Sequence, residues 1–137
     1  MGDTFRSESV AMTEEYGRKL AQELAAGSVV ALYGGMGMGK TALVRGIAAG
    51  LRLDAEVSSP TFALVHDYGG QPPLVHFDMY RVSGWEDLYS TGFFEYLDAG
   101  SILVVEWSEN IENALPTDAI RLRLRRVDDC TGLIERE

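Results

Sequence analysis

The sequence contains little cysteine, little lysine and no long apolar run. Its 137 residues include a single cysteine, Cys130, so no internal disulfide can form, which agrees with a reducing compartment. No segment approaches the roughly 20 consecutive apolar residues that a membrane-spanning helix requires. No basic segment followed by an apolar one opens the chain, so no export signal is recognised. These absences predict a cytoplasmic protein that does not associate with a membrane.

Basic residues are scarce in comparison with acidic ones. The chain has 12 lysines and arginines against 21 aspartates and glutamates, a formal net charge of −9. Such a chain repels phosphate groups and is not expected to bind nucleic acid tightly by itself. Only Lys19 and Lys40 are lysines. No internal repeat or low-complexity segment divides the chain, so one domain over residues 1–137 is expected.

A glycine-rich segment carries the clearest chemical signal. Residues 34–41 read Gly-Gly-Met-Gly-Met-Gly-Lys-Thr, which matches the phosphate-binding loop pattern of Gly, four free positions and Gly-Lys-Thr. An apolar run over residues 29–33 predicts a buried strand that leads into the glycines. Apolar residues at helical spacing between 43 and 51 predict a helix behind them. In this order, strand, loop and helix surround an anion with backbone N–H groups at the positive end of a helix dipole.

The residues of this loop have separate predicted roles. Gly37 and Gly39 can adopt a positive φ and allow the backbone to approach phosphate oxygens closely. We expect Lys40 to bridge the β- and γ-phosphates and the Thr41 hydroxyl to bind Mg²⁺. The predicted nucleotide-binding residues are Gly35, Met36, Gly37, Met38, Gly39, Lys40, Thr41 and Ala42. The alternative is a glycine-rich turn whose lysine and threonine only open a helix.

Two predicted strands end in carboxylates. Apolar residues lead to Asp78 in one and to Glu106 in the other. Because ligands bind at the carboxyl ends of strands in open α/β sheets, both side chains are expected to lie near the γ-phosphate. We assign Asp78 to the metal, directly or through water, and Glu106 to the attacking water, which it would orient or deprotonate. Thr41, Asp78 and Glu106 are the predicted metal-site residues. A turn-forming aspartate and a salt-bridging glutamate are the alternatives.

Further candidates follow the predicted nucleotide helix. Thr61 lies on a connector that Pro60 stiffens, similar to loops that sense the γ-phosphate in nucleotide switches, although a threonine at the start of a strand is the alternative. Lys40, Thr61 and Glu106 are therefore the predicted catalytic residues. His66 and His76 alternate with apolar residues and show no metal-ligand spacing with Cys130, so we interpret both as structural or surface residues.

The order of elements predicts the fold class. Alternation of strands and helices around a phosphate-binding loop indicates a three-layer α/β domain of the P-loop NTPase type. Strands over residues 62–68 and 74–78 would add an antiparallel hairpin to a mostly parallel sheet. We also expect a helix from an N-cap at Ser9 to Ala25, one or two short helices within 83–97 and another over 110–115. The last clear strand is predicted over residues 119–127.

Several segments together resemble the TsaE family, also called YjeE and YdiB, over residues 9–126. In chain order they are Leu32-Tyr33-Gly34 through Gly39-Lys40-Thr41, Ser59-Pro60-Thr61-Phe62, His76-Phe77-Asp78-Met79-Tyr80-Arg81, Glu106-Trp107-Ser108-Glu109 and Leu115-Pro116. The resemblance implies an ATPase that binds ATP and Mg²⁺ and is slow by itself. It also implies association with the TsaB–TsaD heterodimer, which makes threonylcarbamoyladenosine on tRNA, so that tRNA would be contacted only through these partners.

The resemblance also implies roles for single residues. By match of motif, Lys40 and Thr41 are the phosphate and metal residues, Thr61 is the switch threonine and Asp78 is the metal carboxylate. Glu106 and Trp107 fall on the second acidic motif of the family. Gly35 departs from the pattern, because the family commonly has aspartate at that position.

Two other functions fit the same motif. A small-molecule kinase would need an acceptor pocket and an arginine-bearing lid, for which 137 residues leave little chain. A nucleotide-gated docking module would bind ATP with little turnover. GTP is disfavoured as the nucleotide, because no Asn-Lys-x-Asp segment is present.

Overall fold

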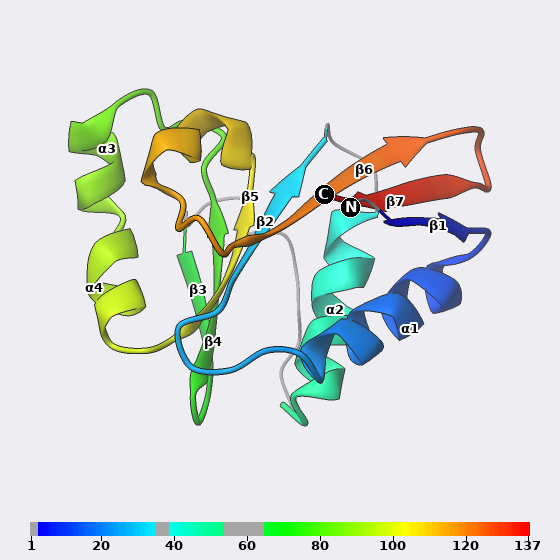
Figure 1. Ribbon diagram of the computed structural model, residues 1–137, viewed down its shortest axis with the longest axis horizontal. Coiled ribbons are helices and arrows are strands. Elements are labelled where there is room, and N and C mark those ends of the chain that lie inside the picture. Colours follow the sequence, from blue (N-terminus) through cyan, green and yellow to red (C-terminus); the bar gives the residue numbers. More distant parts are fainter. Residues whose placement is uncertain (1–2, 35–38, 54–64) are drawn as a thin grey trace.

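The computed structural model describes residues 3–34, 39–53 and 65–137. In chain order the elements are β1 (Asp3–Ser7), α1 (Val10–Ala21), β2 (Val29–Tyr33), α2 (Lys40–Gly50), β3 (Val65–Gly70), β4 (Pro73–Asp78), α3 (Trp85–Ser90), α4 (Phe93–Asp98), β5 (Ile102–Glu106), the 3₁₀ helix η1 (Ser108–Ala114), β6 (Ile120–Arg126) and β7 (Gly132–Arg136) (Figure 1). None of the helices in the described parts of the chain has the length and apolar character needed to cross a bilayer.

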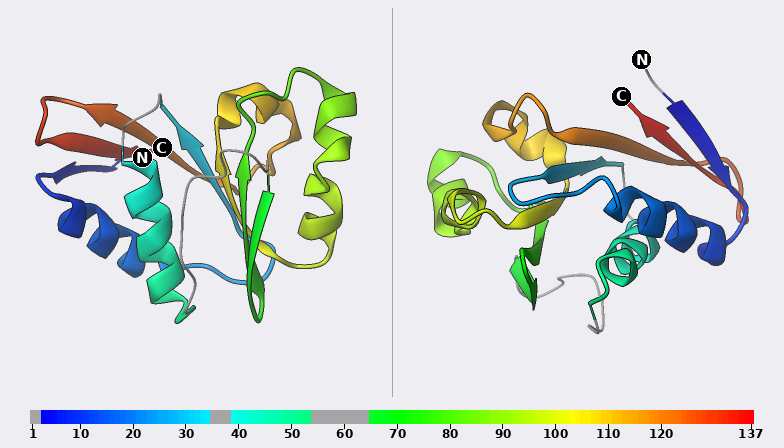
Figure 2. Two further views of the ribbon diagram at one scale, coloured as in Figure 1. Left: turned by 180° about the vertical axis from the view of Figure 1, so that it is seen from behind. Right: turned by 60° about the horizontal axis from the view of Figure 1, so that its bottom comes forward.

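Seven strands of the described residues form one sheet in the order β1-β7-β6-β2-β5-β4-β3. The four central strands, β6, β2, β5 and β4, pair in parallel. The hairpin of β3 and β4 is antiparallel and closes one edge, as the sequence predicted. At the other edge β7 pairs antiparallel with both β6 and β1 (Figure 2). The α/β class with a parallel centre is therefore confirmed. The sheet has a second antiparallel edge, in which a short edge strand within residues 1–8 was one of two expectations and β7 was not predicted.

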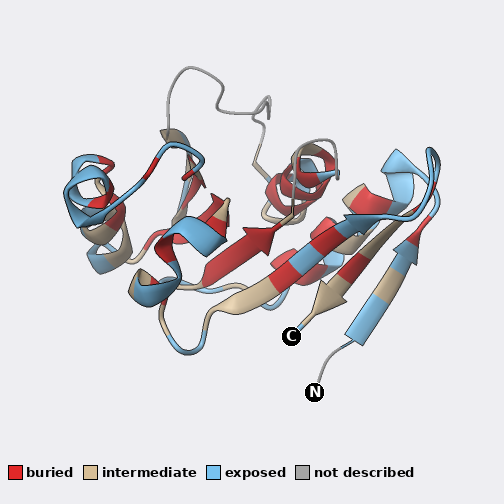
Figure 3. Cartoon of the chain, turned by 90° about the horizontal axis from the view of Figure 1, so that it is seen from above, coloured by how far each residue is buried: buried red, intermediate tan, exposed pale blue. Residues whose placement is uncertain are grey.

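Helices cover both faces of the sheet and make the fold three-layered. Helices α1 and α2 lie on one face, and α3, α4 and η1 lie on the other (Figures 1 and 2). Successive side chains of a strand point to opposite faces, so Val30 and Leu32 of β2 join the core beneath α1 and α2. Val29 and Ala31 join the second core, beneath α3, α4 and η1. All residues of β2 and β5 are buried, as a strand covered on both sides requires (Figure 3).

Two glycines allow α1 and α2 to pack closely against each other. A Cβ atom on Gly46 would lie 2.0 Å from the Glu14 carbonyl oxygen, and one on Gly17 would lie 2.4 Å from the Leu43 carbonyl oxygen. Only residues without a side chain fit such a backbone approach. This contact fixes α2, the helix that begins at the predicted phosphate loop, against the N-terminal helix.

Most predicted elements are present, with differences at their ends. Ser9 caps α1 as predicted, because its side chain accepts a hydrogen bond from the Met12 N–H. The helix ends at Ala21 rather than at Ala25, since the Ala25 N–H donates to the Ser28 hydroxyl instead of to a carbonyl of the helix. Two short helices are present within residues 83–97, and the helix predicted over 110–115 is η1. Strand β7 was missed.

Candidate nucleotide-binding site

The candidate site lies where β2, β4 and β5 end. These strands run parallel to one another in the order β2-β5-β4, so their carboxyl ends meet at one edge of the sheet. The chain leaves β2 at Gly34, which has a positive φ of 125°. A Cβ atom on Gly34 would lie 2.4 Å from the Leu124 carbonyl oxygen, so the absence of a side chain is required here. The first glycine of the sequence motif thus fits against β6.

Helix α2 begins at this edge and brings Lys40 to it. Gly39 precedes the helix with φ of 88°, in the left-handed region that glycine adopts freely. Lys40 is only 5% exposed, and its ammonium group donates a hydrogen bond to the Gly34 carbonyl oxygen at 2.9 Å. Thr41 follows in the first turn of the helix. A lysine buried beside a helix N-terminus concentrates positive charge where the motif predicts a phosphate.

Glu106 faces this lysine from the end of β5. Its Oε1 atom lies 3.7 Å from the Lys40 ammonium nitrogen, and both side chains are almost completely buried. Its Oε2 atom lies 2.5 Å from Nε2 of His76, which is fully buried on β4. A carboxylate with a partner on each oxygen has a fixed orientation. The structure therefore holds Glu106 beside the lysine that the motif assigns to the phosphates.

Trp107 turns the chain away from the sheet directly after Glu106. Its backbone has φ of 58°, in the left-handed region that side chains other than glycine rarely adopt. The indole ring lies with its centre 5.0 Å from the Lys40 ammonium nitrogen, a distance suited to a cation–π contact. Trp107 thus shields one side of Lys40 from water, in addition to packing against the core on its other side.

Asp78 lies beside Glu106 in the neighbouring strand. The two residues are paired in the register of β4 and β5, and the Met79 N–H donates to the Glu106 carbonyl oxygen at 3.0 Å. Burial raises the pKa of the Asp78 carboxyl, and the negative charge of Glu106 raises it further. The Tyr80 N–H lowers this pKa, because it donates a hydrogen bond to Oδ1 at 3.0 Å. A cation placed between the two carboxylates would relieve this unfavourable charge.

The structure brings together Gly39, Lys40, Thr41 and Ala42 at the start of α2 with Asp78 and Glu106 at the strand ends. The remaining predicted site residues, Gly35, Met36, Gly37, Met38 and Thr61, lie outside the described residues. Within the described residues no cluster of three or more histidines, cysteines and carboxylates could hold a metal by itself. A hydroxyl and two carboxylates form a hard-oxygen set, which fits Mg²⁺ when phosphate oxygens complete its coordination.

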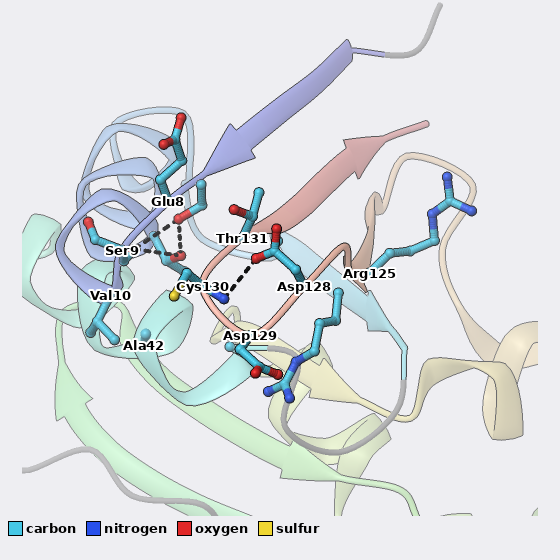
Figure 4. A pocket seen from close by; sticks show the side chains of 14 residues that line it. Glu8, Ser9, Val10, Ala42, Arg125, Asp128, Asp129, Cys130 and Thr131 are labelled. Atoms are coloured by element: carbon cyan, nitrogen blue, oxygen red, sulfur yellow. Dashed lines mark hydrogen bonds between the residues drawn. The ribbon is translucent and has the colours of Figure 1, made fainter.

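A cavity of about 350 Å³ adjoins the start of α2. Gly39 and Ala42 line one side, the segment from Ser7 to Thr13 lines a second, and the turn between β6 and β7 lines a third (Figure 4). In the turn the Asp128 carboxylate accepts a hydrogen bond from the Cys130 N–H at 2.8 Å, which orders the wall of the cavity. Its volume lies in the range of small-molecule sites, roughly 300–1,000 Å³.

Sequence reasoning assigned no part in the site to His76. The structure places this residue against Glu106, and the Tyr68 hydroxyl lies 3.4 Å from its other ring nitrogen, Nδ1. His66 lies on the same side of the hairpin, with Nδ1 3.2 Å from the Tyr68 hydroxyl. Both faces of β4 are buried, and the partner of His76 lies 30 positions further along the chain. The sequence feature that could have indicated a role in the site is its position two residues before Asp78, which places both side chains on the same face of β4.

Comparisons with known proteins show which family and which fold this chain shares. Residues 7–134 match the family model described as threonylcarbamoyl adenosine biosynthesis protein TsaE. A relative from Treponema pallidum, named tRNA threonylcarbamoyladenosine biosynthesis protein TsaE, is 37% identical over 123 residues, which cover 90% of this chain and 91% of the relative. A relative of the same name from Streptomyces coelicolor is 44% identical over 82% of this chain and 78% of its own length. The crystal structure of YdiB from Bacillus subtilis superposes with a TM-score of 0.83 at 28% identity, covering 99% of this chain and 84% of that one.

Proposed function

Because this chain belongs to the TsaE family of tRNA threonylcarbamoyladenosine biosynthesis proteins, we propose that it binds ATP with Mg²⁺ and hydrolyses ATP in support of that modification. One observation carries the proposal. Lys40, Asp78 and Glu106 come from three different elements, and they meet at the edge of the sheet where the glycine motif begins. In this proposal residues 1–137 act as one P-loop ATPase domain in the cytoplasm.

The roles of the site residues follow from their positions. Lys40 binds the β- and γ-phosphates, together with backbone N–H groups of Gly35–Gly39. Glu106 orients the attacking water and takes its proton while the bond from the γ-phosphorus to the β–γ bridging oxygen breaks and ADP leaves. Thr61 responds to the γ-phosphate as a switch residue. The loop residues before Gly39 and Thr61 lie outside the described residues, so their roles rest on the motifs.

Thr41, Asp78 and Glu106 would hold the magnesium ion. When bound, Mg²⁺ neutralises charge on the phosphate oxygens and so favours attack at the γ-phosphorus. Both oxygens of Glu106 already have partners, Lys40 and His76, whereas Asp78 is partly exposed. Asp78 is therefore the proposed direct ligand besides Thr41, and Glu106 acts on the metal through water.

The nucleoside is proposed to occupy the cavity beside Gly39 and Ala42. The triphosphate would begin at the N-terminus of α2, so the ribose and base must extend to one side of it. The cavity of about 350 Å³ opens at this place and is bounded by the start of α1 and the β6–β7 turn. Its walls contain both apolar surface, such as Val10, and hydrogen-bonding groups, such as the Ser9 and Thr131 hydroxyls, as a nucleoside site requires.

Partners complete the proposed function. The TsaB–TsaD heterodimer is the proposed partner, and it would speed the slow hydrolysis of this chain and hold the tRNA. The net charge of −9 supports an indirect contact with tRNA, since this chain would repel RNA phosphates. No membrane contact is part of the proposal.

Phosphate release from ATP by the purified chain, with and without TsaB–TsaD, tests the proposal. We expect slow multiple turnover alone and faster turnover with the partner. Glu106→Ala should keep ATP binding and lose hydrolysis by roughly 10²–10⁴-fold, because a positioned base is removed. Transfer of phosphate to a small acceptor would instead indicate a kinase. Binding of ATP without multiple turnover in either condition would indicate a docking module.

A further inference from the structure

The chain segment that forms α3, α4 and η1 has acidic residues and no basic ones. No lysine, arginine or histidine occurs between Val82 and Ile120. The same stretch contains eight acidic residues, Glu86, Asp87, Glu95, Asp98, Glu106, Glu109, Glu112 and Asp118. All except the buried Glu106 are exposed. A mainly acidic surface attracts basic partners and repels acidic ones.

Large aromatic side chains are exposed in and beside this segment. Tyr80, Trp85 and Tyr89 are 56%, 53% and 60% exposed, and they are half of the large hydrophobic residues exposed in the described parts of the chain. The Trp85 ring stacks on Phe94 at 6.4 Å, and the Tyr89 ring lies 5.2 Å from the same phenylalanine. The rings of Trp85, Tyr89 and Phe94 therefore form one cluster, whereas the Tyr80 ring contacts Trp107. Exposed aromatic clusters bounded by charge are typical of protein interfaces.

A groove lies between α3 and η1 beside this cluster. It has a volume of about 230 Å³, and the buried Leu88 and Ile111 line it together with the exposed Trp85, Glu109 and Glu112. The Glu112 carboxylate already has two partners, since it accepts a hydrogen bond from the Tyr33 hydroxyl and its Oε1 atom lies 3.5 Å from Nε of Arg121 on β6. An arginine or lysine matches this lining, because its aliphatic stem packs on apolar side chains while its charged head contacts a carboxylate and an aromatic ring.

We propose that this groove, the α3–η1 groove, docks a basic segment of a partner protein through an arginine or lysine side chain placed between Trp85 and Glu109. The inference rests on the partner-activated function proposed above and assigns a surface to that partner. The acidic residues disfavour the two other occupants. RNA would be repelled by them, and a second copy of this chain would present the same acidic segment.

The groove is connected to the two carboxylates of the candidate site. Helix η1 directly follows the Glu106–Trp107 turn, and the segment leading to α3 directly follows Asp78. The Asn110 side-chain amide of η1 donates to the Met79 carbonyl oxygen at 2.8 Å, which ties the two segments together. A partner held between α3 and η1 therefore contacts both of the chain segments that leave the site. Docking of a partner can therefore change the positions of Asp78 and Glu106.

The test compares two groove variants with a matched control. Glu109→Arg and Trp85→Ser change the groove, whereas Glu15→Arg makes the same charge change on α1, across the sheet. In calorimetric titrations with purified TsaB–TsaD we expect both groove variants to bind at least about tenfold more weakly, and the control to stay within about twofold of wild type. ATP binding by the isolated chain should be the same in all four proteins. Unchanged association of both groove variants would overturn the proposal.

A second measurement separates failure of the groove from failure of the named partner. If wild-type chain does not bind TsaB–TsaD, the proposed partner is wrong, and a hexa-arginine peptide still tests the groove. Its addition should shift backbone amide resonances within residues 85–90 and 108–114, and Glu109→Arg should remove these shifts while Glu15→Arg keeps them. Shifts elsewhere or none would overturn the proposal. A dimer in sedimentation equilibrium that Trp85→Ser dissociates would also overturn it, with a second copy as the occupant.

Discussion

His76 on β4 and Glu106 on β5 form a buried pair, with Nε2 of the imidazole 2.5 Å from Oε2 of the carboxylate. The other carboxylate oxygen, Oε1, faces Lys40 and lies 3.7 Å from its ammonium nitrogen. Because His76 is fully buried and the Tyr68 hydroxyl lies near its second nitrogen, the imidazole has a fixed orientation of its own. His76 is therefore a positioning residue for the carboxylate that is proposed to orient water.

Replacement of His76 should affect turnover more than nucleotide binding. In His76→Leu the Glu106 carboxylate loses the group that fixes it, so we expect ATP hydrolysis to fall by roughly 10–100-fold, as is common when an orienting partner is removed. The Kd for ATP should change little, since Lys40 and the loop backbone remain. His76→Gln, which can keep an N–H near Oε2, should recover part of the rate. Phosphate release and a fluorescent-nucleotide titration give the two quantities.

His66→Leu is the matched control for this prediction. His66 pairs with His76 in the register of the β3–β4 hairpin, but its ring contacts Tyr68 rather than Glu106. The control should hydrolyse ATP at nearly the wild-type rate. If both leucine variants lose turnover equally, or if ATP binding falls as much as turnover, the role of His76 is structural. Thermal melts of each variant show whether the fold is retained.

Lys40→Ala should weaken ATP binding. The ammonium group is proposed to make charge-assisted hydrogen bonds to phosphate oxygens, each worth about 1.5–3 kcal/mol, so the Kd should rise by roughly 10–100-fold. Lys19→Ala is the control, because Lys19 is the other lysine of the chain and lies exposed on α1. Calorimetric titration with ATP measures both. Near-normal affinity and turnover in Lys40→Ala would show that Lys40 does not bind the phosphates.

The positions of the charged site residues could be predicted because each depends on local sequence. Asp78 and Glu106 both end apolar runs, and the rule that strand ends meet at one edge brings them together. The contact of His76 with Glu106 could not be predicted in the same way. It depends on the relative register of β4 and β5, and the alternating pattern of β4 is equally consistent with a histidine that serves only the core.

Two features of the fold were also not predictable from local sequence alone. Strand β7 has one buried apolar residue, Ile134, and its pairing with β1 joins opposite ends of the chain, so its local signal is weak. The helical pattern of α1 continues beyond Ala21 because Leu24 still packs against the core, although the backbone there has left the helix. In both cases tertiary contacts decide what hydrophobic periodicity leaves open.

ATP should protect Cys130 from alkylation. Cys130 is exposed, it is the single cysteine of the chain, and it lines the cavity proposed for the nucleoside. A bound ribose and base would cover the thiol, so the rate of reaction with iodoacetamide should fall several-fold at saturating ATP. Tripolyphosphate, which has no nucleoside, should protect less. Mass spectrometry of the intact protein follows the reaction. Equal reaction rates with and without ATP would show that the nucleoside binds elsewhere.

Gly46→Ala should destabilise the protein through the contact between α1 and α2. The added methyl group would lie 2.0 Å from the Glu14 carbonyl oxygen, which belongs to the backbone and cannot turn away as a side chain could. The helices must separate, and overpacking of this kind costs about 1–3 kcal/mol, or roughly 3–15 °C in Tm. Differential scanning calorimetry measures the change.

Gly84→Ala provides the comparison for Gly46→Ala. No atom lies within 4 Å of a Cβ placed on Gly84, and its φ of −174° is extended backbone that any residue adopts. Its loss of stability should stay below about 1 kcal/mol, the cost of alanine at a helix N-cap. A Tm for Gly46→Ala equal to that of Gly84→Ala would mean that α1 can shift without loss of packing. In that case α2 would depend on the sheet alone for its position beside the strand ends.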